Sequence, residues 1–169
     1  MKPMLQRSTQ SLQSPLGPIT LAATAQGLCG VWFEGQRHGP SDAQVQSWHV
    51  DDAHPVLQAA ALQLHAFFAG QVQQFELPLD LSAGTPFQQA VWRALLAIPL
   101  GQTQSYGDLA KQLLKPTAVR AVGSAVGRNP LSIVVPCHRI LGANGQLTGY
   151  AGGLWRKQAL LQLEGHLAA

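Results

Sequence analysis

The stretch SYGDLAKQLLKPTAVRAVGSAVGR, residues 105–128, decides the fold of the second half of the chain. Ser105 and Asp108 form a capping-box pattern, which predicts a short helix that extends to about Leu114. A Lys-Pro-Thr turn then leads into a second predicted helix at residues 118–128. Two short helices joined by a tight turn are typical of a helix-turn-helix unit.

One face of the second helix is almost free of large side chains. Arg120, Ser124 and Gly127 share this face, whereas three valines cluster on another side. A glycine inside a helix destabilises the helix by up to about 1 kcal/mol relative to alanine. The presence of Gly123 and Gly127 at these positions therefore needs an explanation. Close approach to another backbone supplies one. The sequence alone leaves open whether that backbone belongs to a partner molecule or to a tightly packed neighbour within the protein.

A further helix is predicted directly upstream of this unit. Thr85 suits the N-cap, Pro86 the first helical position and Gln88 the partner position of a capping box. Pro99 and Gly101 end the helix. Its apolar stripe is formed by Phe87, Val91, Leu95 and Ile98.

The first half of the chain is predicted to contain a hairpin, a loop and one helix. Turn residues around short apolar runs predict β strands between residues 16 and 33, and the polar residues 34–52 predict a long loop. Apolar residues spaced at i, i+4, i+7 and i+11 predict a helix over residues 55–69, which Gly70 ends. Residues 75–81 are either a further strand or a linker.

Charge is distributed unevenly between the two halves. Up to Asp80 the chain has three basic and six acidic residues, and from Leu81 onward it has eight basic and two acidic residues. This favours two domains, residues 1–80 and 81–169, of which the second meets a polyanion, although a merely solvated basic face is the alternative. We therefore expect an α+β or α/β chain, with a small N-terminal α/β domain of hairpin sheet and helix and a mostly helical C-terminal domain.

Composition restricts the class of protein further. A hydrophobic fraction of 46% over 169 residues supports a folded core and argues against disorder or a fibrous repeat. No apolar run reaches the roughly 18 residues that span a bilayer, and no signal-peptide pattern is present. Cys29 and Cys137 lie far apart without a C-x-x-C motif, which argues against a disulfide scaffold and a cysteine zinc site. We expect a soluble, intracellular protein with two free thiols.

Cys137 is the candidate nucleophile. The β-branched run at residues 133–135 predicts a buried strand that ends at Pro136 and brings the thiol to a strand end. A thiolate is a good nucleophile, and a neighbouring His or Arg lowers the pKa of a thiol. His138 is adjacent in sequence but reaches the thiol only if the chain turns. The alternative is a small buried hydrophobe beside a surface histidine, which is also how we interpret Cys29.

The segment from Thr85 to Glu164 resembles the O6-alkylguanine-DNA alkyltransferases, also called methylated-DNA–protein-cysteine methyltransferases. The shared motifs are TPFQQAVW (85–92), IPLGQTQSYG (98–107), RAVG (120–123), NP (129–130), IVVPCHRI (133–140) and GYAGGL (149–154). Before Asp80 only the stretch SPLGPIT, residues 14–20, fits the family.

The resemblance implies a C-terminal winged helix-turn-helix domain whose second helix enters the DNA minor groove. Arg120 matches the arginine that replaces an extruded nucleotide, and Tyr106 matches the tyrosine that crowds the adjacent phosphate. Extrusion is required because O6 of a stacked guanine is out of reach of a thiol. The residues expected to contact DNA are Thr103, Tyr106, Arg120, Ala121, Gly123, Ser124 and Arg128.

The resemblance also assigns the chemistry. Cys137 matches the alkyl acceptor, and His138, through a water, and Glu164 match the relay that removes the thiol proton. Asn129 matches the residue that holds the turn before the cysteine, and Tyr150 the one that helps guanine to leave. The expected substrate pocket contains Val135, Pro136, Ala151 and Gly152.

Position 151 departs from the family, because many members carry serine there. We hypothesise that Ala151, Gly152 and Gly153 admit alkyl groups larger than methyl. The resemblance implies no cofactor. We expect no bound zinc either, because the only other cysteine, Cys29, lies in an apolar strand.

The expected function is stoichiometric repair of DNA, in which one alkyl group moves irreversibly from O6 of guanine to Cys137; whether O4 of thymine is a second donor is left open by the sequence. The partner would be double-stranded DNA that contains O6-alkylguanine, and the protein would act as a cytoplasmic, nucleoid-associated monomer without membrane contact. One alternative is a non-enzymatic lesion sensor, but such relatives lack the acceptor cysteine. Another is a Cys-His hydrolase, which would need an oxyanion hole that nothing in the sequence indicates.

Overall fold

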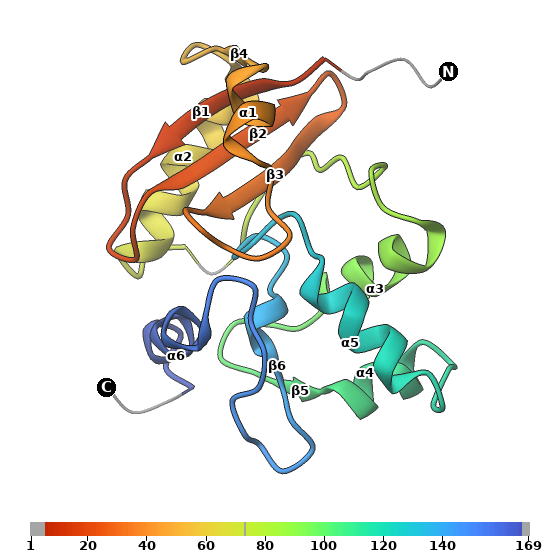
Figure 1. Ribbon diagram of the computed structural model, residues 1–169. Helices are drawn as coiled ribbons and strands as arrows, with labels where there is room; N and C mark the ends of the chain where they lie inside the picture. The colour runs from red at the N-terminus through yellow and green to blue at the C-terminus, as the bar shows by residue number, and fades with distance from the viewer. Residues whose placement is uncertain (1–5, 73, 167–169) are drawn as a thin grey trace.

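A four-stranded sheet forms the N-terminal part of the molecule (Figure 1). The computed structural model describes residues 6–72 and 74–166. The strands are β1 (Ser8–Leu12), β2 (Ile19–Thr24), β3 (Gly27–Phe33) and β4 (His49–Val50), in the spatial order β3-β2-β1-β4. Neighbouring strands among the first three are antiparallel, whereas β4 runs parallel to β1. The predicted hairpin is therefore confirmed as β2–β3 and extended by two strands.

One long helix packs on this sheet. Helix α2 (Pro55–Phe68) buries Leu57 and Leu64 of the predicted apolar stripe together with Ala60 and Phe67, whereas Ala61 and Phe68 of that stripe are partly buried. The prediction that residues 34–52 form only a loop was wrong, because they contain α1 (Asp42–Gln46) and β4. Helix α1 begins at a capping box between Ser41 and Gln44, and β4 is too short to produce a readable alternation.

The C-terminal part is mostly helical. Thr85 with Gln88 and Ser105 with Asp108 both form the expected capping boxes. Trp92 joins two of the helices, because its Nε1–H donates to the carbonyl of Ala125 at 2.8 Å. The elements are α3 (Pro86–Leu96), β5 (Gln104–Ser105), α4 (Tyr106–Gln112), α5 (Val119–Gly127), the 3₁₀ turn η1 (Cys137–Arg139), β6 (Ile140–Leu141) and α6 (Leu154–Leu163).

The segment before the cysteine is a buried turn and not the strand that its β-branched residues predict. Ile133 has a φ of 72°, and the amide of Val135 donates to the carbonyl of Leu131 at 2.9 Å. Asn129 accounts for this difference: its Nδ2 donates to the Val135 carbonyl at 2.8 Å and its Oδ1 accepts from the Leu131 amide at 2.9 Å. Side-chain hydrogen bonds to the backbone thus replace a strand ladder.

Strand β3 links the two parts of the molecule. The amide of Val31 donates to the carbonyl of Pro130 at 2.8 Å, and the amide of Ser132 donates to the carbonyl of Val31 at 3.1 Å. Along the same edge, opposite β2, Leu28 pairs with Leu79 of the connecting segment. Most of the buried apolar residues of both parts form one continuous core. The chain is therefore a mixed α+β fold in which the turn before Cys137 rests directly on the N-terminal sheet.

No helix within residues 6–72 and 74–166 combines the length and apolar character needed to cross a bilayer.

Candidate active site

Cys137 lies in a pocket of about 130 Å³ between the two parts of the molecule. It is the first residue of η1 and is 6% exposed. The wall comes from four segments: α5, the start of α4, the loop before α6 and the loop after β3. The lining residues are Arg37, His38, Tyr106, Gly123, Val126, Gly127, Gly149, Tyr150 and Ala151.

A buried ionic network joins the two residues that follow Cys137 to Glu164 at the end of α6. His138 Nε2 is 2.9 and 3.0 Å from the two carboxylate oxygens of Glu164. Arg139 binds the same carboxylate through two nitrogens, Nε and Nη2, each at 2.8 Å. Its Nη1 donates to the carbonyl of Ile98 at 2.6 Å, which ties the network to the end of α3. The bidentate geometry fixes the carboxylate in place.

The charges of this network define the state of His138. Burial alone would raise the pKa of Glu164, but the hydrogen bonds from Arg139 and His138 outweigh it and lower the pKa to about 2. An ionised carboxylate only accepts hydrogen bonds, so Nε2 of His138 carries a proton. Burial lowers the pKa of His138 against the opposing effect of Glu164. The ring is then neutral at pH 7, and Nδ1 is the nitrogen with a free lone pair.

Nδ1 of His138 is buried and makes no hydrogen bond to the described residues. This nitrogen is therefore able to accept a proton, which is the role that the sequence predicts for this residue. Glu164 lies 26 residues further along the chain, and the fold brings the two together.

The pKa of the Cys137 thiol is raised by burial, while the side chain of Asn129 and the charge of Lys157 act in the opposite direction. Lys157 is itself buried on α6, where its Nζ donates to the carbonyls of Ile140 at 2.5 Å and Thr148 at 2.7 Å. Burial lowers the pKa of Lys157 to about 8. Our sequence analysis missed this lysine.

A signal for Lys157 was present in the sequence. It lies three and four residues before Leu160 and Leu161, which places it on the apolar face of its helix, and all three are buried. A lysine on such a face is a candidate for a buried charge with dedicated partners.

The predicted pocket residues separate into two groups. Ala151 lines the pocket, as does Tyr150 with its separate predicted role, whereas Val135, Pro136 and Gly152 are buried without lining it. The carbonyl of Val135 already accepts hydrogen bonds from Asn129 and from the amide of Cys137. Burial raises the pKa of Tyr150 well above its ordinary value, so its hydroxyl keeps its proton and remains a donor.

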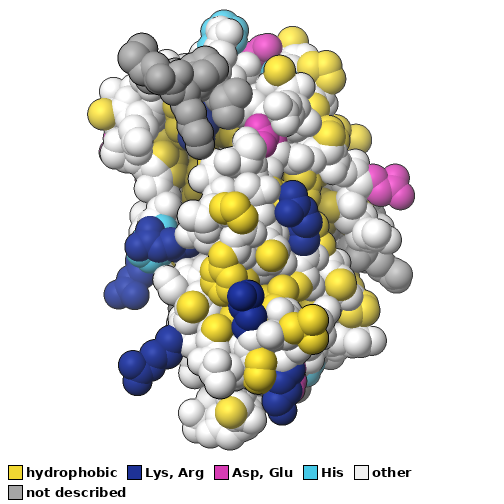
Figure 2. Space-filling view, turned by 90° about the vertical axis from the view of Figure 1, so that its right-hand side faces the viewer, with side chains coloured by type: hydrophobic (Ala, Val, Ile, Leu, Met, Phe, Trp, Pro, Cys, Tyr) yellow, Lys and Arg dark blue, Asp and Glu magenta, His cyan; other side chains and the backbone are white. Residues whose placement is uncertain are grey.

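The predicted DNA contacts lie on and beside α5. Arg120, Ala121, Ser124 and Arg128 are exposed, whereas Thr103, Tyr106 and Gly123 are partly buried. Figure 2 shows Lys and Arg side chains spread among apolar ones over the face that includes this side of the molecule.

The two glycines of α5 are not required by internal packing. A Cβ at Gly127 would meet nothing within 4 Å, and one at Gly123 would lie at an ordinary 3.7 Å from the ring of Tyr106. Of the two explanations that the sequence left open, close approach by a partner therefore accounts better for these residues.

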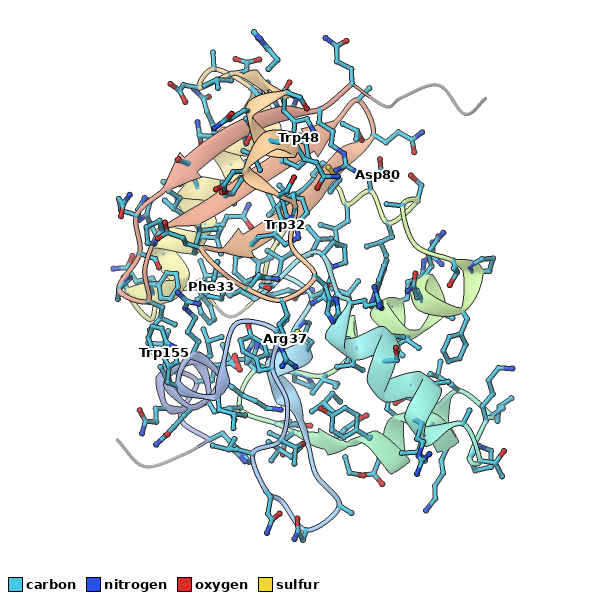
Figure 3. All side chains as sticks on the ribbon, viewed as in Figure 1. Trp32, Phe33, Arg37, Trp48, Asp80 and Trp155 are labelled. Atoms are coloured by element: carbon cyan, nitrogen blue, oxygen red, sulfur yellow. The ribbon has the colours of Figure 1, made fainter. Side chains whose placement is uncertain are left out.

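Sequence reasoning also missed Arg37 and His38, which follow β3 and reach the pocket. The amide of Arg37 donates to the carbonyl of Ala151 at 2.8 Å. Figure 3 shows Arg37 where this loop meets the helical part of the molecule. No local pattern could have identified these residues, because their position depends on how the sheet docks on the second half.

Among the described residues, no group of three or more His, Cys, Asp or Glu side chains is placed to hold a metal ion. Cys29 and Cys137 are both unpaired thiols.

Comparison with known proteins gives a consistent match along the chain. The family model described as "6-O-methylguanine DNA methyltransferase, DNA binding domain" matches residues 86–166, and that described as "6-O-methylguanine DNA methyltransferase, ribonuclease-like domain" matches residues 9–81. The methylated-DNA–protein-cysteine methyltransferase of Mycobacterium tuberculosis H37Rv is 48% identical over 155 residues, which cover 92% of this chain and 90% of that protein. The protein of the same name from Methanosarcina acetivorans is 47% identical, over 90% of this chain and 95% of that one.

Solved structures show the same similarity. The crystal structure of M. tuberculosis OGT in complex with DNA matches with a TM-score of 0.82 and 47% identity, covering 95% of this chain and 92% of that chain. The O6-methylguanine-DNA methyltransferase of Pyrococcus kodakaraensis KOD1 matches with a TM-score of 0.67 and 25% identity, over 95% of this chain and 99% of that chain.

Proposed function

The chain belongs to the 6-O-methylguanine DNA methyltransferase family, and on that premise we propose that Cys137 is its alkyl acceptor. Its activity is the direct repair of alkylated DNA by transfer of the alkyl group to a cysteine of the protein itself. The observation that carries the assignment of Cys137 is its position in the pocket, directly before the two residues that form the buried network with Glu164.

The transfer step follows from these positions. Nδ1 of His138, through a water, takes the thiol proton and leaves a thiolate. The thiolate attacks the alkyl carbon in line, so that an S–C bond forms while the bond from that carbon to O6 breaks, and its electron pair goes to the guanine. Tyr150 donates a hydrogen bond to the leaving base. The thioether is stable and nothing regenerates the thiol, so each protein acts once.

The damaged nucleotide must leave the duplex before this step. Arg120 is exposed on α5 and would fill the space of the extruded nucleotide, while Tyr106, at the pocket wall, would crowd the adjacent phosphate. The small residues of α5 allow the helix to approach the minor groove, where recognition depends little on sequence. Such a mode suits a protein that must search DNA of any sequence.

The alternatives are less well supported. A lesion sensor needs no acceptor, whereas this chain has a thiol in the pocket. A Cys-His hydrolase would need donors for an oxyanion, and the named relatives are alkyl acceptors rather than hydrolases.

The remaining properties are proposals as well. The partner is double-stranded DNA that carries O6-alkylguanine, residues 1–80 form a supporting domain and residues 81–169 the domain with the acceptor. We also propose that the protein acts as a monomer. No cofactor is needed, and the expected compartment is the cytoplasm, with the protein on the nucleoid when it is bound to DNA.

The roomier-pocket hypothesis rests on Ala151, which lines the pocket without a side-chain donor. Methyl and benzyl adducts at O6 should then both react. Single-turnover rates on two duplexes that differ only in the alkyl group measure this, and a benzyl rate near zero would contradict it.

Peptide mapping by mass spectrometry tests the proposed function. The purified protein is mixed with a duplex that bears one O6-methylguanine, and an undamaged duplex of the same sequence is the control. We expect one added methyl group per protein, located on Cys137. A methyl group on Cys29, or none at all with tight binding to the damaged duplex, would contradict the proposal.

A further inference from the structure

A single arginine joins the N-terminal sheet to the loop that carries Tyr150 and Ala151. Arg156 lies in the first turn of α6, and its guanidinium carbon is 4.6 Å from the ring centre of Phe33 at the end of β3 and 4.6 Å from that of Trp155. Figure 3 shows Phe33 and Trp155 on the two sides of the boundary between the sheet and α6. The planar cation is stacked on both rings.

The same guanidinium connects the backbones of the two parts. Its Nε donates to the carbonyl of Leu16, in the turn between β1 and β2, at 2.9 Å. Its Nη1 donates to the carbonyl of Gly152, in the loop before α6, at 3.0 Å. The planar guanidinium of Arg156 therefore fixes the distance between the turn at Leu16 and the loop at Gly152.

The backbone of this loop is also held from α6, because Nζ of Lys157 donates to the carbonyls of Thr148 and Gly149. Gly149 has a φ of 25° and Gly153 a φ of 93°, and glycine has the widest range of backbone conformations. Gly152 lies between two rings, because a Cβ there would come within 2.9 Å of Tyr150 and 3.1 Å of Phe33. The amide of Arg37 holds the preceding carbonyl, that of Ala151. The part of the loop that follows Tyr150 is thus held by contacts with the N-terminal sheet and by Arg156, whereas the part before it is held by Lys157.

We propose that Arg156 is a positioning residue for alkyl transfer, through which the N-terminal sheet sets the place of Tyr150 and Ala151 relative to Cys137. The N-terminal part then has a role beyond support, because the pocket takes its reactive shape only when the sheet is docked. This inference rests on the proposed function of the Cys137 pocket.

The test uses the full chain and the variant Arg156→Lys, which keeps the charge but loses the planar fork. Trp155→Leu is a second variant that removes one stacking ring and leaves both hydrogen bonds. Arg93→Lys is the matched control, because Arg93 is exposed on α3 and donates to Gln89 one turn earlier. Single-turnover methyl transfer at increasing concentrations of an O6-methylguanine duplex separates the limiting rate from the half-saturating concentration.

We expect the limiting rate of Arg156→Lys to fall between about 10-fold and 100-fold, since a small misplacement of reacting groups has effects of this size. Affinity for an undamaged duplex and the thermal unfolding midpoint should stay close to those of the parent, and the ratio of benzyl to methyl rates should change. The limiting rate of Trp155→Leu should fall by a smaller factor, and that of Arg93→Lys should equal the rate of the parent.

Two results would overturn the inference. One is an unchanged limiting rate in Arg156→Lys. The other is a fall in the limiting rate that is no larger than the fraction of Arg156→Lys that is unfolded, together with an unchanged ratio of benzyl to methyl rates. If the parent protein itself transferred no methyl group, the proposed function would fail first, and that result is distinguishable because it appears without any substitution.

Discussion

The two cysteines of this protein are almost equally buried and yet have different surroundings. Cys29 in β3 is 5% exposed and Cys137 is 6% exposed. Burial raises the pKa of Cys29 to about 11, and the charge of Arg7 opposes this only in part. Cys29 packs in a small apolar cluster with Ala22 and Trp32.

Cys137 has polar support that Cys29 lacks. Burial raises its pKa too, but Asn129 and Lys157 act against this, and His138 follows it in the chain. Cys137 also faces a pocket, whereas Cys29 is not among the residues that line it. Exposure therefore does not distinguish the two thiols, whereas the polar groups around them do, and these favour the proposed role of Cys137.

The largest expected effect is the difference in methyl transfer between substitutions of the two cysteines. Cys137→Ser should lose all methyl transfer and keep its binding to a duplex that carries O6-methylguanine, because the groups proposed to contact DNA are unchanged. Cys29→Ala should transfer one methyl group per protein at the parental rate. Intact-mass measurement after reaction gives the stoichiometry, and an electrophoretic mobility shift gives the binding. Transfer by Cys137→Ser would refute the assignment.

Glu164→Gln tests the buried His138–Glu164–Arg139 network, which Cys137 has beside it in the chain and Cys29 lacks. The amide has no charge to hold Arg139 and His138, so the buried guanidinium loses its counter-charge. We expect a loss of about 3 kcal/mol in the free energy of unfolding. The transfer rate should fall at least about 100-fold, the typical contribution of general base catalysis. Urea unfolding and single-turnover kinetics measure the two effects.

The matched control for this substitution is Glu76→Gln, because Glu76 is exposed on the segment that connects the two parts. It should change neither quantity by a measurable amount. Equal effects of the two substitutions would show that the network has no special role.

Acid should weaken the same network to a smaller extent. The pKa of Glu164 is about 2 in the folded protein, below its ordinary value of 4.5. A lowered pKa means that the carboxylate contributes stability above about pH 4.5, and this contribution is lost as the pH falls toward 2. Urea unfolding between pH 5 and 2 should show a steeper decrease for the parent than for Glu164→Gln. Parallel curves would contradict this.

The helices around the site were predictable because their signals are local. Thr85 with Gln88 and Ser105 with Asp108 specify two helix starts by hydrogen bonds within one turn. The proposed roles of Cys137, His138 and Glu164 follow from the resemblance to a family. The contact between His138 and Glu164 could not be predicted from their spacing.

The predictions from sequence were wrong or incomplete where side-chain hydrogen bonds and tertiary contacts override the local preference for a secondary structure. Residues 133–135 favour a strand by propensity, but Asn129 binds the backbone on both sides of them and forms a turn. Arg37 reaches the pocket only because β3 lies against the turn before Cys137. Such placements depend on the docking of two distant segments, which no local pattern encodes.

The most direct test of the account is the protonation state of His138. In protein with ¹⁵N-labelled histidine, the ring nitrogens are assigned by comparison with His138→Gln and observed by NMR at pH 7. We predict a neutral ring with the proton on Nε2, which Glu164 accepts, and an unprotonated Nδ1 that is free to take the thiol proton. A proton on Nδ1, in the other neutral form or in the imidazolium, would contradict the proposed activation of Cys137.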